Sequence, residues 1–257
     1  MRPHCILPKD RIILPLDFSD TAQAQRIVER LGSLVGMFKF GLEVTCSSLA
    51  DLMILEDGQA IRNLIALRAL AKAVGSSRAF VDLKFHDIPN TVGQATAAIA
   101  RTGAAFINVH ASAGLAAMQK AVVNKGDSKI LVVTLLTSLG TEDLLGLGHT
   151  PLTSKDAVVR AMAELAVKAG VDGFICSPQE IGLLRSMPEL KDAIIVTPGI
   201  RAKDAPPDDQ KRTMTAGEAV KAGADYIVVG RPITAAQDPF EAARRIADEI
   251  RVALAEI

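Results

Sequence analysis

The amino-acid sequence predicts an α/β protein and, within that class, a single (β/α)₈ barrel of the TIM type. The chain has 257 residues, which is the usual size of one such barrel. Short apolar runs rich in Ile, Val and Phe recur eight times along it, and helix-like segments separate them. Near-continuous apolar strands that alternate with helices form a parallel sheet covered on its outside. Eight such units favour a closed barrel over the alternative, a doubly wound open sheet.

Each expected strand is a short apolar run of the composition that favours strands. In chain order the runs are Ile12–Leu16, Met37–Phe40, Ala79–Leu83, Phe106–Val109, Ile130–Leu135, Gly173–Ile175, Ile194–Thr197 and Tyr226–Val229. Helix-like segments include Thr21–Leu31, Val92–Arg101, Leu115–Val123 and Asp156–Ala169, with Gly32, Gly103 and Gly170 at or near the ends of three of them. Glycine commonly ends a helix. The last helix is expected to begin with Asp238 as its cap and Pro239 in its first turn.

No linker, low-complexity tract or block of like charge divides the chain, so we expect residues 1–257 to form one catalytic domain. The longest spans between strands are residues 41–78 and 136–172. The first holds two amphipathic stretches, and the second holds a Gly/Thr-rich loop, Ser138–Thr153. Both are expected to be elaborated loops or extra helices rather than further domains.

The composition excludes several classes of protein. Apolar residues make up 49% of the chain, enough for a large core, and 29 basic residues balance 29 acidic ones. A balanced charge offers no field that attracts nucleic acid or an anionic membrane, so neither is expected as a partner. The three cysteines are scattered, and no apolar run approaches the roughly 20 residues that span a bilayer. The N-terminus lacks the apolar core of a signal peptide, and we expect a cytoplasmic protein.

Polar residues gather where the expected strands end, which is where barrel active sites form. These residues are Asp17, Lys39, Asp82, Lys84, His110, Thr137, Ser177, Pro198, Gly199, Arg201, Gly230 and Arg231. Any one of them alone is explained by an ion pair at a strand end. Acids and lysines at several strand ends together indicate an active site, because buried charges are costly unless they are paired.

The densest polar stretch covers residues 81–91. Side chains two apart on a strand point the same way, so Asp82 and Lys84 are both expected to face the barrel interior. A lysine held against a carboxylate stays protonated and is ready to act as a general acid. Asp87 lies beyond the strand. It has two interpretations, as a site residue or as the cap of the next helix, with Pro89 in the first turn.

The stretch DLKFHDIPNT, residues 82–91, closely resembles the signature of the orotidine-5'-phosphate decarboxylase family. Further matches follow in order: PLD ending at Asp17, FKFGLE around Lys39, VVTLLTS with Thr137, TPGIR with Arg201, then Gln210, and DYIVVGRPIT with Gly230 and Arg231. The resemblance runs from about Ile13 to Thr234. Only the segment Glu43–Ser76 departs from it, being longer than the family's second unit. Thr45–Glu56 does not match the family pattern, so the dimer surface or the local helix packing is expected to differ there.

The resemblance implies decarboxylation of orotidine 5'-phosphate to UMP, the final step of de novo pyrimidine nucleotide synthesis, without a cofactor or a metal. It implies that Asp82, Lys84 and Asp87 form a charge array around the scissile carboxylate. Lys84 would stabilise the carbanion-like intermediate and protonate it. Lys39 would pair with Asp82 and hold a ribose hydroxyl.

The remaining implied contacts concern the nucleotide. Asp17 would bind a ribose hydroxyl, Thr137 would lie beside the pyrimidine, and Pro198 would contact the substrate. Arg201, Gln210, Gly230 and Arg231 would hold the phosphate, in agreement with the independent rule that barrels bind phosphate after strands seven and eight. Asp87 and Thr91 would reach the neighbouring subunit's site, which implies a homodimer. The segment Arg201–Arg212 is interpreted as a lid that carries Gln210, or otherwise as a solvated loop.

Two other functions remain open on the residues. The nearest is a metal-dependent sugar-phosphate decarboxylase on the same barrel, similar to 3-keto-L-gulonate-6-phosphate decarboxylase. Those relatives use a carboxylate on the second strand to help bind magnesium, whereas this chain has Lys39, which would repel a metal. His4, His86, His110 and His149 are far apart and indicate no metal cluster. The other function is a catalytically silent scaffold, which the intact set of acids and lysines argues against.

Overall fold

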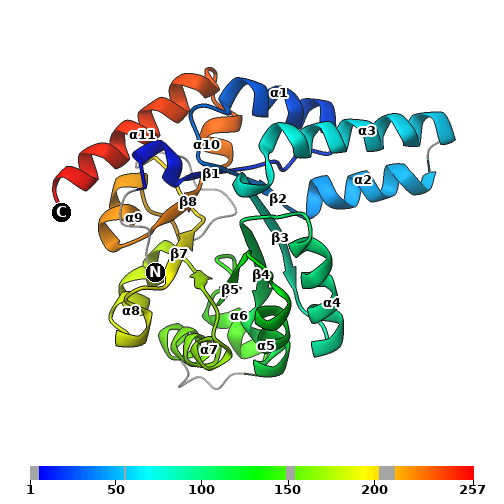
Figure 1. Ribbon diagram of the computed structural model, residues 1–257. Helices are drawn as coiled ribbons and strands as arrows, with labels where there is room; N and C mark the ends of the chain where they lie inside the picture. Colours follow the sequence, from blue (N-terminus) through cyan, green and yellow to red (C-terminus); the bar gives the residue numbers. More distant parts are fainter. Residues whose placement is uncertain (1–5, 55, 149–153, 203–211) are drawn as a thin grey trace.

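The computed structural model describes residues 6–54, 56–148, 154–202 and 212–257. Parallel strands pair in chain order there, and the pairing of β1 with β8 closes them into a barrel (Figure 1). The strands are β1 Ile12–Pro15, β2 Met37–Phe40, β3 Ala79–Phe85, β4 Phe106–His110, β5 Lys129–Val133, β6 Gly173–Ile175, β7 Ile194–Thr197 and β8 Tyr226–Val228. The predicted closed barrel is therefore confirmed, and the open sheet is excluded.

The strand period of two sorts the side chains between the barrel interior and the helix layer. One buried cluster fills the interior: Ile13, Met37, Phe80, Phe106, Leu131, Val133, Ile175, Ile194 and Val196. A larger buried cluster packs the outer faces of the strands against the helices. Two residues beyond Met37, Phe80 and Phe106 the same face carries a lysine, an aspartate and an asparagine. The apolar interior therefore ends in a polar layer at the carboxyl ends of the strands.

Helices cover the barrel on its outside (Figure 1). They are α1 Thr21–Leu31, α2 Leu42–Ile54, α3 Asp57–Val74, α4 Pro89–Ala100, α5 Leu115–Asn124, α6 Thr141–Gly146, α7 Lys155–Ala169, α8 Ile181–Arg185, α9 Ala216–Ala222, α10 Arg231–Thr234 and α11 Pro239–Ala255. The predicted cap is confirmed, since the Asp238 carboxylate accepts hydrogen bonds from the backbone N–H groups of Phe240 and Glu241. Helix α4 begins three residues before the predicted Val92, because Pro89 opens its first turn.

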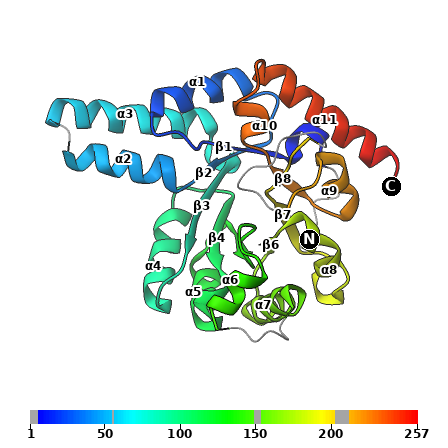
Figure 2. The same ribbon diagram turned by 180° about the vertical axis from the view of Figure 1, so that it is seen from behind.

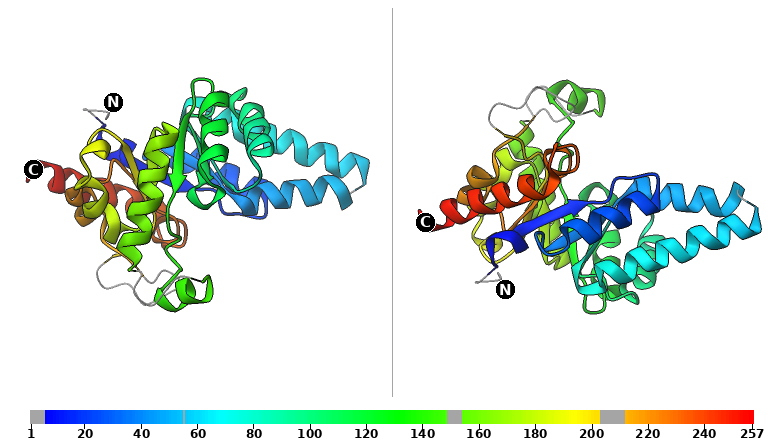
Figure 3. Two further views of the ribbon diagram at one scale, coloured as in Figure 1. Left: turned by 90° about the horizontal axis from the view of Figure 1, so that it is seen from below. Right: turned by 90° about the horizontal axis from the view of Figure 1, so that it is seen from above.

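The long span between β2 and β3 forms the predicted extra helices. Helices α2 and α3 pack as a hairpin that projects beyond the other helices, as the views from behind, below and above show (Figures 2 and 3). Val44 is the one buried residue of α2, whereas Leu42, Leu49 and Met53 are exposed on its surface. The hairpin largely coincides with the segment Glu43–Ser76, which is expected from the sequence to depart from the family pattern. The second long span holds the short helix α6, and residues 149–153 of its predicted loop lie outside the described residues.

Candidate active site

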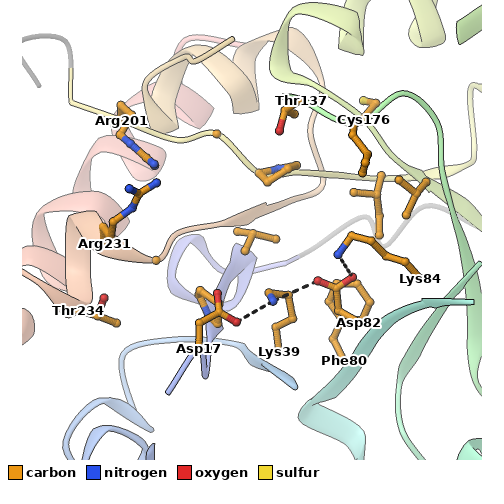
Figure 4. Close-up of a pocket in the computed structure, with 18 of the residues that line it drawn as sticks. Asp17, Lys39, Phe80, Asp82, Lys84, Thr137, Cys176, Arg201, Arg231 and Thr234 are labelled. Atoms are coloured by element: carbon orange, nitrogen blue, oxygen red, sulfur yellow. Dashed lines mark hydrogen bonds and ion pairs between the residues drawn. The ribbon is translucent and has the colours of Figure 1, made fainter. Parts of the chain in front are cut away.

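A cavity of about 350 Å³ opens at the carboxyl ends of the strands (Figure 4). Its lining comes from the ends of β1, β2, β3, β5, β6, β7 and β8 and from the loops that follow them. The polar and charged members of this lining are Asp17, Lys39, Asp82, Lys84, Thr137, Arg201, Arg231 and Thr234. The cavity therefore lies where barrel enzymes place their chemistry.

Four side chains form a continuous line of alternating charge across the cavity floor. The Lys39 Nζ atom lies 3.1 Å from Asp17 Oδ1 and 3.1 Å from Asp82 Oδ2. The other carboxylate oxygen of Asp82 accepts a hydrogen bond of 2.7 Å from Lys84 Nζ. Lys39 and Asp82 are buried, and each offsets the desolvation of the other. The expected pairing of Lys39 with Asp82 is present in the structure.

The environment of Lys39 keeps this lysine charged. Burial by itself would lower the pKa of Lys39, but the carboxylates of Asp82 and Asp17 outweigh it, and the pKa is raised above its usual value. Lys39 is consequently a permanent cation at neutral pH. A cation on the second strand fits an anionic substrate and opposes a metal ion at the same place.

A break in the β3–β4 pairing places Asp82 and Lys84 side by side. Val81 pairs with Ile107 but Phe85 pairs with Val109, so β3 has two more residues than β4 over this stretch. Lys84 has a φ of 49°, a left-handed conformation that residues with a Cβ rarely adopt. Bulges of this kind redirect side chains and are common next to active sites. The sequence predicted that both side chains lie on one face of a regular strand. In the structure they also lie together, but the strand is irregular at this point.

The far side of the cavity carries two arginines. Figure 4 shows the guanidinium groups of Arg201 and Arg231 turned toward each other, on the side of the cavity opposite Lys84. Arg201 follows β7, and Arg231 opens α10, which follows β8. Gly199, before Arg201, has a φ of 76°, a conformation that glycine adopts without strain. Two guanidinium groups at one place can bind a phosphate through several hydrogen bonds.

The cavity brings together most of the residues expected from the sequence. Asp17, Lys39, Asp82, Lys84, Thr137, Pro198, Arg201, Gly230 and Arg231 all line it. Asp87 and Thr91 do not line it, and both are exposed around the start of α4. The alternative interpretation of Asp87 as a helix cap is wrong, because Ile88 occupies the cap position and no side chain caps this helix. Gln210 and most of the expected lid lie outside the described residues.

Sequence reasoning missed an ion pair behind the cavity. Arg212 and Glu180 are both buried and form a salt bridge. The Arg212 guanidinium also donates to the backbone carbonyls of Leu136, at 2.8 Å, and Thr137, at 3.4 Å. Glu180 accepts from the backbone N–H of Ser177. The pair thus connects the segment after β5 to the segment after β6. No local sequence pattern predicts it, because its partners are 32 residues apart.

Asn108 was also missed, although it is almost completely buried beside Asp82. A polar residue in the middle of the apolar strand Phe106–His110 was the available signal.

Among the residues that the structure describes, no group of three or more His, Cys, Asp or Glu is arranged to hold a metal ion. Within the same ranges, no helix combines the length and apolar character needed to cross a membrane.

Comparison with known proteins agrees with this geometry. The model of the family described as "Orotidine 5'-phosphate decarboxylase / HUMPS family" matches residues 10–246. The orotidine 5'-phosphate decarboxylase of Geobacter sp. (strain M21) is 43% identical over 248 residues, covering 93% of this chain and 95% of the relative. The chain belongs to the orotidine 5'-phosphate decarboxylase / HUMPS family.

Further members of this family match over similar lengths. The orotidine 5'-phosphate decarboxylase of Methylococcus capsulatus is 44% identical over 243 residues, covering 94% of this chain and 92% of the relative. Among solved structures, the enzyme of that name from Lactobacillus acidophilus has a TM-score of 0.73 at 31% identity, covering 93% of this chain and 98% of its own. The enzyme from Pyrococcus horikoshii has a TM-score of 0.69 at 26% identity, covering 93% and 99%. The resemblance seen in the motifs therefore extends over nearly the whole chain.

Proposed function

We propose that this chain decarboxylates orotidine 5'-phosphate to UMP, with Lys84 as the proton donor within the Asp17–Lys39–Asp82–Lys84 array. The activity is supported by membership of the family and by the relatives that are called orotidine 5'-phosphate decarboxylase. The single structural observation that carries the mechanism is the unbroken line of alternating charges on the floor of a cavity whose far side holds two arginines. An array of this kind is electrostatically organised before the substrate arrives.

The chemical step breaks the bond between the ring carbon and the carboxylate. Carbon dioxide leaves, and the electron pair of that bond stays on the ring carbon. The Lys84 ammonium stabilises this negative charge as it forms and then transfers a proton to the carbon. Lys84 becomes neutral and regains a proton from solvent. Asp82 holds the Lys84 Nζ atom at 2.7 Å, which keeps the donor oriented until the substrate is bound.

The rest of the nucleotide is assigned to the cavity walls. Arg201 and Arg231 bind the phosphate, together with Gln210, and Gly230 lets the backbone approach the phosphate oxygens. Asp17 and Lys39 bind the ribose hydroxyls, while Thr137 and Pro198 contact the base. Phosphate binding lies away from the reacting carbon, so it contributes to rate only by orienting the substrate and excluding water.

The functional unit is proposed to be a homodimer in a cytoplasmic location. Asp87 and Thr91 are exposed and do not line their own chain's cavity, which supports a role in the neighbouring subunit's site. The scattered cysteines support a reducing compartment.

The test is an ultraviolet assay that follows the loss of orotidine 5'-phosphate with the purified protein. We expect turnover to UMP, and we expect it to persist after exhaustive dialysis against a chelator. Failure to consume this nucleotide under conditions where a verified decarboxylase does so would contradict the proposal. Activity that disappears on dialysis and returns with magnesium would instead favour a metal-dependent sugar-phosphate lyase, against which the position of Lys39 argues.

A further inference from the structure

Asn108 contacts both members of the central catalytic pair. It lies on β4, and only 1% of its surface is exposed. Its amide Nδ2 donates a hydrogen bond of 2.5 Å to Asp82 Oδ1. Its amide Oδ1 accepts a hydrogen bond of 2.8 Å from the backbone N–H of Lys84. Asp82 Oδ1 is the same oxygen that binds Lys84 Nζ, so one buried side chain is linked to the proton donor at its backbone and through its carboxylate partner.

The contact with the Lys84 backbone compensates for the break in the β-sheet. Asn108 lies opposite residues 82–84, where β3 has two residues more than β4. A backbone N–H that leaves the regular ladder must find another acceptor, because an unpaired buried donor is costly. The side-chain carbonyl of Asn108 provides that acceptor for Lys84, whose left-handed φ of 49° lies outside the strand region. The amide thus takes the place of a peptide group that the irregular pairing has moved away.

We propose that Asn108 is a positioning residue for the decarboxylation. It holds Lys84 in its left-handed backbone conformation and holds the Asp82 carboxylate, so that the ammonium group stays where the ring carbon must be protonated. The inference rests on the proposed role of Lys84. Asn108 does not itself line the cavity, so its effect on the reaction passes through Asp82 and Lys84.

An amide meets both requirements at once, since it has one donating and one accepting end. Leucine has a similar volume but neither end. Aspartate keeps the acceptor for Lys84 but, when ionised, places a negative charge against Asp82. When a single proton is shared between Asp82 and an aspartate at 108, the pair again has one donor and one negative charge, as in the natural protein. Two carboxylates in contact raise the pKa of one of them, so this proton binds at an accessible pH.

The first experiment compares Asn108→Leu and Asn108→Asp with a matched control, Thr134→Val. Thr134 is completely buried in the segment after β5, and its hydroxyl donates to a backbone carbonyl outside the charge array. We expect Asn108→Leu to lower kcat by about 10²-fold, near the lower end of what a placed general acid contributes. The affinity for UMP, measured by calorimetry, should change by less than about threefold, because the phosphate contacts are elsewhere. Thr134→Val should lose thermal stability while keeping its kcat.

The second measurement is the pH profile of Asn108→Asp, divided at each pH by that of the natural protein. The ratio should rise as the pH falls, since a proton shared with Asp82 restores the donor. The other titratable groups near the array are Asp17, Lys39, Lys84, His86 and His110, and the division removes the part of their contribution that is the same in both proteins. A purely structural role for Asn108 predicts a flat ratio.

Several outcomes would overturn the proposal. One is a kcat for Asn108→Leu close to that of the natural protein; another is a flat or falling ratio for Asn108→Asp. If Asn108→Leu does not fold, the pH dependence of the Asn108→Asp ratio tests the proposal by itself. Failure of the proposed function is distinguishable, because the natural protein itself would then show no turnover of orotidine 5'-phosphate.

Discussion

A side chain at Gly41 would collide with the ammonium group of Lys39 in its present position. A Cβ atom at position 41 would stand 2.7 Å from Lys39 Nζ and 2.9 Å from Asp17 Oδ1. The backbone at Gly41 has no left-handed φ, so the glycine is needed for space and not for conformation. The first residue after β2 therefore sets the room available to the Asp17–Lys39 ion pair.

Gly41→Ala should accordingly impair the site more than the fold. Lys39 Nζ is the end of a flexible side chain and can move aside, so we expect a loss of stability below about 1 kcal/mol. The displaced ammonium would separate from Asp17 and Asp82, and kcat/KM should fall at least about tenfold. The matched control is Gly182→Ala, since a Cβ there meets nothing within 4 Å. Unchanged kinetics of Gly41→Ala beside a normal control would show that the lysine position is not critical.

Arg231→Ala should separate phosphate binding from chemistry. We expect a higher KM for orotidine 5'-phosphate and little change in the slow turnover of unphosphorylated orotidine. The comparison of the two substrates is its own control, because a misfolded protein would lose both activities. Equal losses on both would place Arg231 at the reacting carbon or in the fold, and not at the phosphate.

The buried Glu180–Arg212 pair should be important for stability in an asymmetric way. Removing one partner leaves an uncompensated buried charge, so Arg212→Met is expected to destabilise the protein by about 3–5 kcal/mol. The double variant Arg212→Met with Glu180→Met should recover part of this loss, because no charge is left unpaired. Denaturant unfolding of the two variants and the natural protein measures the difference. A double variant no more stable than Arg212→Met would mean that the contacts of Arg212 with Leu136 and Thr137 matter more than the pair.

We expect the stability of the protein to depend on pH because of the environment of His110. Burial, followed by the nearby His86 and Lys84, lowers the pKa of His110 below its ordinary value of 6.5. Between the lowered value and 6.5 the unfolded chain binds a proton that the folded protein does not, so stability rises with pH across this window and is lost as the pH falls through it. His110→Gln should show a smaller decrease in the free energy of unfolding between pH 7 and pH 5, in about the range where histidine titrates. Identical slopes would mean that His110 is readily protonated in the folded protein.

Asp87 provides the test of the proposed dimer with shared sites. Lys84→Ala and Asp87→Ala are each expected to be inactive, and their subunits are then allowed to exchange. If Asp87 acts in the neighbouring site, each mixed dimer has one site with both defects and one with none. Random exchange makes half of the dimers mixed, so activity should return to about a quarter of that of the natural protein. No recovery, despite demonstrated exchange of labelled subunits, would confine Asp87 to its own chain.

The sequence by itself determined the barrel and the family. Strand boundaries came within a few residues because apolar runs and their period of two are local properties. Lys39, Asp82 and Arg231 were identified because parallel strands bring their carboxyl ends to one rim, and because DLKFHDIPNT is a specific local pattern. The structure brings these residues to one cavity.

Tertiary structure decided the contacts between residues far apart in the chain. The hydrogen bonds of Asn108 to Asp82 and Lys84 depend on a break in the pairing of β3 with β4, and no local pattern records which residues of two strands lie opposite each other. The Glu180–Arg212 pair likewise exists only because the closed barrel brings two separate loops together. Hydrogen bonds and ion pairs of this kind form only when donor and acceptor lie about 3 Å apart. Those distances are set by strand register and packing, which arise only when the whole barrel has closed.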